Sequence, residues 1–255
     1  MRKLTAGVVA LCSVVTLLSI PAPPAAASGW DYDLALYLFA LGLDGRTVVR
    51  GREADVDVSF SDIVEDLEMA ATGHFEAAKR DSRWGWFGDV NYSSSGQNFG
   101  NDLGEYDLDM IYLEGAGTYR FGEGLQVLAG LRYTDLDMTL DFRPPIQPPI
   151  DPPPGPVRVE GSQSWTDLMI GGRYRATFGE RWGFSARGDL AGFGISDSSD
   201  LTWNVVLLGR FQVAHRIGLL LGYRWYDIDY ENQDDLFVFD VMQQGPVFAL
   251  NYSFY

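Results

Sequence analysis

The chain has 255 residues, a formal charge of −16 at pH 7 and one cysteine, Cys12. This acidic balance argues against binding of nucleic acid, whose phosphates require a basic face, and a lone cysteine cannot form an internal disulfide. With 46% hydrophobic residues, 14% aromatic residues and 29 glycines, the chain is too apolar for disorder and too rich in glycine and aromatics for a helical bundle. We therefore expect an ordered all-β protein.

The first residues have the features of a secretory signal peptide. Arg2 and Lys3 precede an apolar run over 4–20, and Ala25 and Ala27 occupy the positions of an A-x-A cleavage site. A short membrane anchor is the alternative, but no basic stop-transfer flank follows the run. We predict a signal peptide over 1–27 and one barrel domain over 28–255, without cysteine and with a charge of −18 after loss of Arg2 and Lys3.

Ten later segments alternate apolar and polar residues with the period of two that indicates strands. They cover about 30–40, 73–77, 84–92, 111–119, 125–133, 168–174, 182–190, 201–211, 219–225 and 248–254. No stretch after the signal peptide has the roughly 18 uninterrupted apolar residues of a membrane-spanning helix. A membrane protein of this sequence would have to be a closed β-barrel.

The connections between these segments alternate in length. Four are short, at 81–83, 121–124, 179–181 and 214–216, whereas those at about 43–68, 94–106, 139–162, 194–200 and 231–240 are longer. Short turns on one rim and long loops on the other are typical of outer-membrane barrels with both ends in the periplasm. The sequence predicts a transmembrane antiparallel up-and-down β-barrel of ten strands, with eight or twelve as alternatives.

The orientation of the two strand faces separates a membrane barrel from a soluble one. A soluble, lipocalin-like barrel would turn its apolar face inward and its charges outward. The membrane version is favoured because aromatic residues gather at strand ends and Phe254 and Tyr255 close the chain. We expect a protein of the bacterial outer membrane, with outer-membrane lipids and the barrel assembly machinery as partners.

The polar faces supply the candidate lumen-lining residues. These are His74, Glu76, Asp89, Glu114, Arg132, Asp167, Arg173, Arg175, Arg187, Asp189, Arg210 and Arg224. With Asp31 and Asp33 added, seven acids face six arginines, and such charges are expected to pair in a confined space. A salt-bridged lumen favours a structural or interaction role, and a pore or transporter for small solutes is the alternative. Glycines two residues before Arg132, Arg173 and Arg224 are expected to make room for the long side chains.

Catalytic and metal sites are weakly supported. Beyond the signal peptide the histidines are His74, near Glu76 but without a serine motif, and His215 in a short turn. An outer-membrane enzyme is therefore the third alternative, and we expect no enzymatic activity. An acidic group, Asp227, Asp229, Glu231, Asp234 and Asp235, could attract Ca²⁺. An EF-hand loop beginning at Asp227 would need glycine and glutamate where the chain has Asn232 and Val238. We expect no metal and no cofactor, and the sequence names no small-molecule ligand.

Two segments depart from the strand period. Ser61 could cap a short helix over 61–67 that folds into the barrel mouth, with an ordinary surface loop as the equal alternative. Eight of the twelve prolines lie between Pro144 and Pro156, which predicts an extended outer loop, either a stiff spacer or a partner-binding segment.

Several motifs resemble a family of bacterial outer-membrane β-barrel proteins, porin-like small barrels that are mostly uncharacterised. They cover 55–63 (DVDVSFSDI), 130–133 (GLRY), 165–167 (WTD), 172–174 (GRY), 181–182 (RW), 187–194 (RGDLAGFG), 201–203 (LTW), 222–225 (GYRW) and 227–230 (DIDY). Leu168 stands where the family usually has proline, and Tyr255 extends one residue past the usual terminal aromatic. The resemblance covers most of the mature chain and implies the barrel fold, without implying an activity.

Overall fold

The computed structural model describes residues 29–40, 42–58, 70–99, 104–142 and 157–254. The predicted signal peptide (1–27), the predicted helix (61–67) and the proline-rich segment (144–156) lie outside the described residues. In the described part of the chain, no helix is long and apolar enough to cross a membrane.

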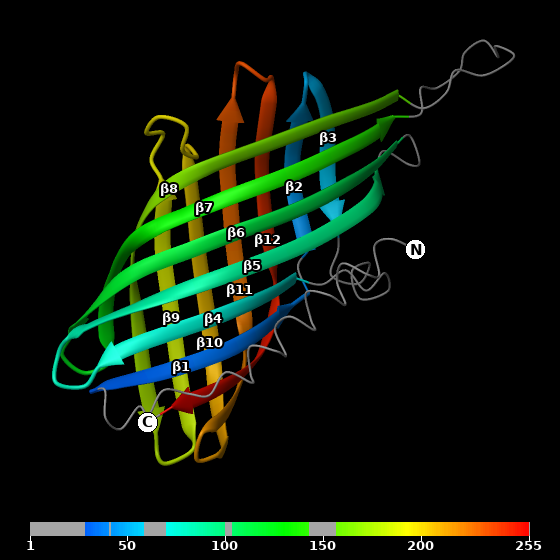
Figure 1. Cartoon of the computed structure of the whole chain (residues 1–255). Coiled ribbons are helices and arrows are strands. Elements are labelled where there is room, and N and C mark those ends of the chain that lie inside the picture. The colour runs from blue at the N-terminus through cyan, green and yellow to red at the C-terminus, as the bar shows by residue number, and fades with distance from the viewer. Residues whose placement is uncertain (1–28, 41, 59–69, 100–103, 143–156, 255) are drawn as a thin grey trace, which may run out of the picture.

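A closed barrel of ten antiparallel strands dominates the fold (Figure 1). The strands are β1 (Trp30–Phe39), β2 (Gly42–Val49), β3 (Arg52–Val58), β4 (Ala70–Lys79), β5 (Trp84–Phe99), β6 (Gly104–Phe121), β7 (Leu125–Phe142), β8 (Val157–Phe178), β9 (Trp182–Gly192), β10 (Leu201–Ala214), β11 (Ile217–Asn232) and β12 (Phe237–Phe254). Strand β1 pairs with β4 on one side and β12 on the other, so that β1 and β4–β12 close the barrel. The predicted fold class and strand number are confirmed.

Strands β2 and β3 form a hairpin in the segment 43–68, for which the sequence predicts a long loop. The hairpin adds to the outer part of β12, where Leu43 is paired with Gln243 and Val48 with Val238. Its turn holds Arg50 and Gly51 at φ of 50° and 75°, as a two-residue type I′ turn requires. The prediction of an irregular connection was wrong here because Arg-Gly is a weak turn signal and charged residues interrupt the apolar positions.

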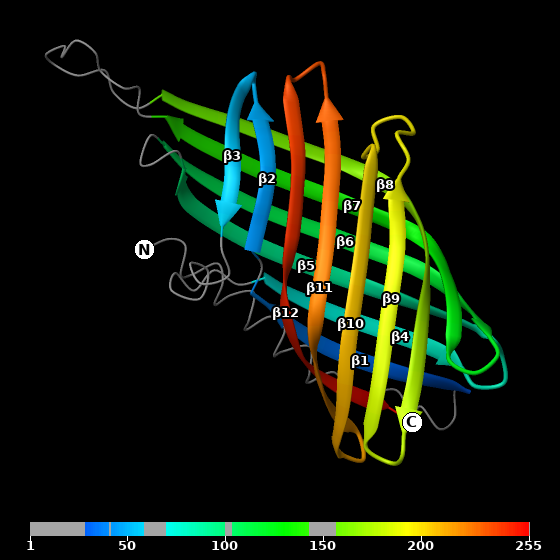
Figure 2. The ribbon, with the colours of Figure 1, turned by 180° about the vertical axis from the view of Figure 1, so that it is seen from behind.

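The strands also run further than predicted toward the long-loop rim. Strands β7, β8 and β12 continue into segments expected to be loop, and β5 extends to Phe99. Figures 1 and 2 show that β5–β8 form one layer crossing over a second layer of β9–β12 with the β2–β3 hairpin. Between these layers lies an outer apolar cluster. It consists of Leu43, Val49, Val56, Tyr106, Leu108, Met110, Tyr112, Leu136, Met138, Leu140, Trp165, Tyr226, Ile228, Tyr230, Phe237, Phe239 and Val241.

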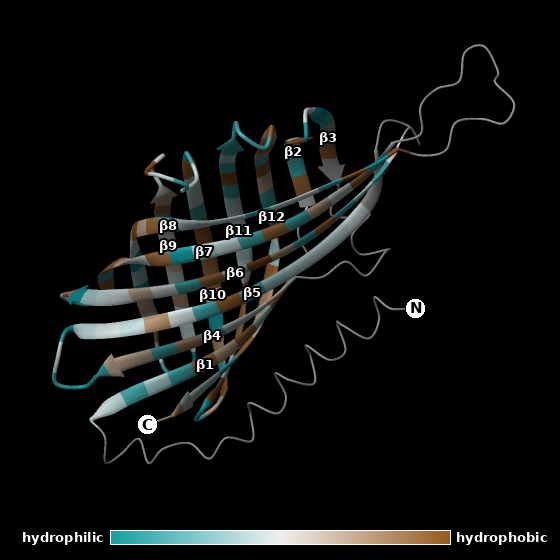
Figure 3. Ribbon diagram, turned by 45° about the horizontal axis from the view of Figure 1, so that its top comes forward, coloured by the Kyte–Doolittle hydropathy of each residue, from teal (hydrophilic) through white to brown (hydrophobic). Residues whose placement is uncertain are grey.

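The two faces of each barrel strand differ sharply in polarity. Large apolar side chains point outward and are exposed, such as Leu221 at 66% and Ile170 at 58%, whereas Arg132 on an inward face is 0% exposed. The alternating hydropathy along the strands is visible in Figure 3. A soluble barrel requires the opposite orientation, so the structure has the exterior of a protein surrounded by lipid.

Candidate functional site in the barrel lumen

The structure places the twelve predicted lumen residues on inward-facing positions of β4–β11. Nine of them are buried, namely His74, Glu76, Asp89, Glu114, Arg132, Asp167, Arg173, Asp189 and Arg224. Arg187 and Arg210 are partly buried, and Arg175 is more open. Every second residue of each strand points into the lumen, so residues far apart in the sequence meet across the barrel.

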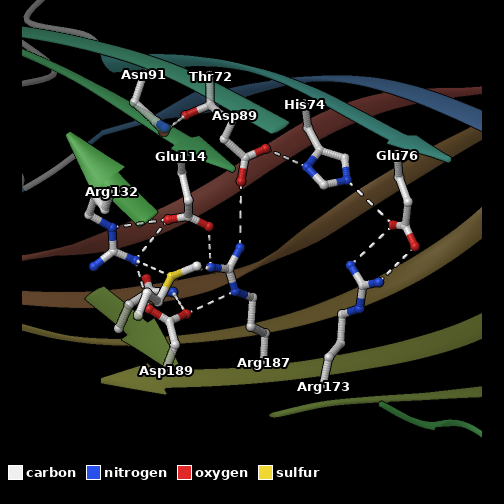
Figure 4. A network of polar contacts seen from close by, with 12 residues as sticks. Thr72, His74, Glu76, Asp89, Asn91, Glu114, Arg132, Arg173, Arg187 and Asp189 are labelled. Carbon is white, nitrogen blue, oxygen red and sulfur yellow. Dashed lines mark hydrogen bonds and ion pairs between the residues drawn. The ribbon is translucent and has the colours of Figure 1, made fainter. Parts of the chain in front are cut away.

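Four of these residues form a compact ion-pair group (Figure 4). Arg132 donates to Glu114 Oε2 from Nε at 3.0 Å and from Nη2 at 2.8 Å, and its Nη2 also lies 2.7 Å from Asp189 Oδ1. Arg187 donates from Nε to Asp189 Oδ2 at 2.8 Å and also bonds Glu114. Two carboxylates and two guanidinium groups therefore neutralise one another where side chains from β6, β7 and β9 meet.

A second group is centred on Glu76 of β4. Arg173 Nη2 donates to Glu76 Oε1 at 2.7 Å, and Arg175 Nη2 donates to Glu76 Oε2 at 2.5 Å. Gln126 shares this group by accepting from Arg173 Nη2 at 2.6 Å. These contacts span the lumen from β4 to β7 and β8.

His74 connects the two groups. Its Nδ1 bonds the carboxylate of Asp89, and its Nε2 lies 3.5 Å from Glu76 Oε2. Asp89 in turn lies 3.5 Å from Arg187. Both ring nitrogens are thus engaged by carboxylates, so His74 acts as a bridge in the ion-pair network.

The predicted balance of seven acids against six arginines is not realised in the structure. Asp31 pairs with Arg80 at the short-turn rim, and Asp33 accepts from Ser253 at 2.5 Å. Asp167 binds the backbone and hydroxyl of Ser199 at 2.8 and 2.9 Å. Four carboxylates are left for the arginines, and Arg210 and Arg224 bond the neutral side chains Gln212 and Asn204 instead. Sequence reading overcounted the pairs because it could not show which acids bind non-charged partners.

The prediction that glycines make room for arginines was also wrong. A Cβ at Gly130 would lie 2.1 Å from Gly115 O, and one at Gly222 would lie 1.8 Å from Leu207 O. At Gly171 the nearest atom is Gly188 O, at 2.4 Å. These glycines are therefore required by the close approach of the neighbouring strand's backbone.

Sequence reasoning missed the neutral residues that complete the network. Asn204 accepts from Arg224 Nε at 2.8 Å and donates to Asp189 Oδ2 at 2.9 Å. The rings of Tyr112 and Tyr226 face the guanidinium groups, with Arg224 Cζ 4.6 Å from the Tyr226 centroid. Their inward position in the strand alternation was the available signal, since these three residues share a face with Glu114, Arg210 and Arg224.

The acidic group of β11 lies outside the lumen. Asp227 and Asp229 face outward, beyond the exposed apolar side chains of the barrel exterior. Partial burial of Asp229 raises the pKa of its carboxyl, and the negative charge of Asp240 raises it further. Asp235 accepts from Gln163 at 2.9 Å. Within the described ranges, no three acidic, histidine or cysteine side chains are arranged to hold a metal ion.

Asp167 anchors the β9–β10 connection to the barrel, and we expect Asp167→Asn to loosen it. The asparagine keeps a single acceptor oxygen for the three donors now supplied by Ser199 N, Ser199 Oγ and Trp165 Nε1. The unfolding free energy should fall by about 1–3 kcal/mol, the usual cost of unsatisfied buried polar groups. Limited proteolysis should show faster cleavage within 194–200, and an unchanged cleavage rate would contradict the anchoring role.

Comparison with known proteins supports the fold. No family model and no curated protein matches the chain. Among solved structures, the outer membrane protease OmpT from Escherichia coli is similar over 88% of this chain and 97% of its own, with a TM-score of 0.52 and 10% identity. The translocator domain of the autotransporter NalP from Neisseria meningitidis covers 98% of this chain and 97% of its own, with a TM-score of 0.47 and 8% identity.

A further similarity involves the attachment invasion locus protein Ail of Yersinia pestis, at a TM-score of 0.40 and 12% identity over 89% of this chain and 99% of its own. The similarity to OmpT, with a TM-score of 0.52, shows a shared fold, and at 10% identity it shows no shared activity. The closed ten-stranded barrel with its apolar exterior defines the chain as an integral β-barrel of the bacterial outer membrane.

Proposed function

We propose that this protein is an outer-membrane barrel with a closed lumen, which has a structural or interaction role at the cell surface. The observation that carries this proposal is the filling of the lumen at two levels. The ion-pair network crosses the barrel from β4 to β9, and the outer apolar cluster packs the two layers together beyond it. Solutes would have to break both to pass.

The outer apolar cluster supports the interaction role. Trp165 and Tyr230 stack with ring centroids 4.1 Å apart, and Phe237, Phe239 and Val241 are at most 1% exposed. Strands that continue beyond the apolar belt and pack like a β-sandwich form a rigid outer head. Such a head can present loops to a partner, whereas a wide pore needs an open mouth.

An enzymatic role is not part of the proposal. A general base needs a ring nitrogen available to the substrate, whereas both nitrogens of His74 face carboxylates.

We also propose two partners for the barrel. Lipids contact the exposed apolar side chains of its exterior, and the barrel assembly machinery inserts the chain into the membrane. Neither interaction requires a cofactor.

Single-channel recording in planar bilayers tests the closed lumen. We expect the refolded protein to give no stable conductance steps, because side chains of the ion-pair network and of the outer apolar cluster occupy the lumen in the described part of the chain. Heat-dependent gel mobility on the same sample confirms that the barrel is folded. Reproducible, ohmic steps from folded protein would overturn the proposal in favour of the pore.

A further inference from the structure

Arg224 is a buried cation that forms no ion pair with a described carboxylate. It is 7% exposed, its Nε donates to Asn204 Oδ1 at 2.8 Å, and its Cζ lies 5.4 Å from the ring centroid of Phe39. Among the described residues, no carboxylate oxygen forms an ion pair with it, in contrast to Arg132, Arg173, Arg175 and Arg187. Burial of a guanidinium that is not directly paired with a carboxylate is costly, so this position favours a negative ligand.

Arg224 faces a cavity in which positive charge is in excess. The cavity has a volume of about 90 Å³, and four arginines line it, Arg173, Arg175, Arg187 and Arg224. Its lining carboxylates are Asp89 and Glu114, which are already bonded to His74 and Arg132 respectively. Arg173, Arg175 and Arg187 are also bonded to carboxylates, so Arg224 is the lining arginine for which no ion pair with a described residue exists.

The cavity is large enough for a small ligand. Its volume of about 90 Å³ has room for several waters or one small oxyanion. Polar neutral groups from Thr72, Asn91 and Ser185 line the same space and can complete the hydrogen bonding.

The lining arginine with the most exposed side chain lies toward the short-turn rim. Arg175 lies close to the β8–β9 turn that begins at Gly179, and 43% of its side chain is exposed. Toward the opposite rim, the outer apolar cluster closes the interior. Since the short turns of outer-membrane barrels lie in the periplasm, the occupant would enter from there.

We propose that this cavity binds one small oxyanion, a tetrahedral phosphate or sulfate or a planar carboxylate, with Arg224 as its principal ligand. Guanidinium groups bind such anions through paired, charge-assisted hydrogen bonds. Arg187 in the lining and Arg175 nearer the short-turn rim add further positive charge around the occupant. The proposal goes beyond a closed-lumen role, because a sealed barrel needs no ligand and conductance would not report on this site.

Heat unfolding of the folded, detergent-solubilised barrel tests the anion site. Phosphate, sulfate and acetate are titrated separately at constant ionic strength, and the unfolding midpoint is followed by circular dichroism. A ligand that binds the folded state alone raises the midpoint in a saturable way. The three anions distinguish a tetrahedral from a carboxylate site, and we expect at least one of them to give a saturating rise.

Two variants localise the effect. Arg224→Gln removes a cation that is not part of an ion pair, so the barrel should fold, and we expect its anion affinity to fall about tenfold or more. Arg158→Gln, in the exposed pair with Asp141, is the matched control and should keep the wild-type response. Isothermal titration with the same anions provides a second readout. Absence of a saturable response in the wild type, or an equal response in Arg224→Gln, would overturn the proposal.

Discussion

Replacement of Glu114 by glutamine is expected to destabilise the folded barrel by about 3–5 kcal/mol, the usual cost of breaking a buried ion pair. Glu114 compensates both Arg132 and Arg187, and the side chains of Arg132 and Glu114 are 0% and 2% exposed. Glutamine keeps the shape but leaves Arg132 with Asp189 alone, and Arg187 with Asp189 and the more distant Asp89. Urea unfolding of the barrel in lipid vesicles, followed by tryptophan fluorescence, measures the change.

Two further variants separate charge from packing. Asp141→Asn removes one partner of the exposed pair with Arg158, whose side chain is 61% exposed, and should leave the midpoint unchanged. The double variant Glu114→Gln with Arg132→Met removes both charges and should be less destabilised than the two single changes added together. If Glu114→Gln and Asp141→Asn have the same small effect, the ion-pair network does not stabilise the lumen.

Phe239→Ala is expected to cost about 3–5 kcal/mol of unfolding free energy, as truncation of a buried aromatic usually does. Phe239 is 0% exposed in the outer apolar cluster, where the two strand layers pack together. The neighbouring Leu236→Ala is the matched control, because Leu236 is 61% exposed in the turn before β12. The difference between the unfolding free energies of the two variants measures how much packing of the outer apolar cluster stabilises the folded protein.

Comparable stabilities of Phe239→Ala and Leu236→Ala would show that the outer apolar cluster is not a packed core. The outer half of the lumen would then be open to water, and the closed-lumen proposal would lose one of its two levels.

The barrel could be predicted from the sequence because residue alternation and short turns are visible within short stretches of the chain. Alternation along 125–133 places Leu131 and Tyr133 outward and Arg132 inward, and the structure shows this arrangement, with Leu131 52% exposed. Short turns such as 121–124 separate strands that pair directly, Phe121 with Leu125. Strand number and orientation follow from such patterns.

The details of the lumen could not be predicted because they depend on contacts across the barrel. Glu76 meets Arg173 although 97 positions separate them, and the pairing depends on the stagger of the closed sheet. Whether Asp167 would bind an arginine or Ser199 depends on the path of the β9–β10 connection. The β2–β3 hairpin was missed for a similar reason, since only its docking on β12 makes strands of these charged segments.

Site-directed spin labelling of β7 tests most directly that the strands turn apolar residues to lipid and polar or buried residues to a sealed interior. Because Cys12 is the single cysteine, a chain expressed from residue 28 has none, and labels can be placed at Leu131 and Leu128. In vesicles, we predict strong oxygen collision and weak collision with a polar nickel reagent at 131, and weak collision with both at 128, where Leu128 is 1% exposed. Strong nickel collision at 131 together with high oxygen collision at 128 would contradict the account.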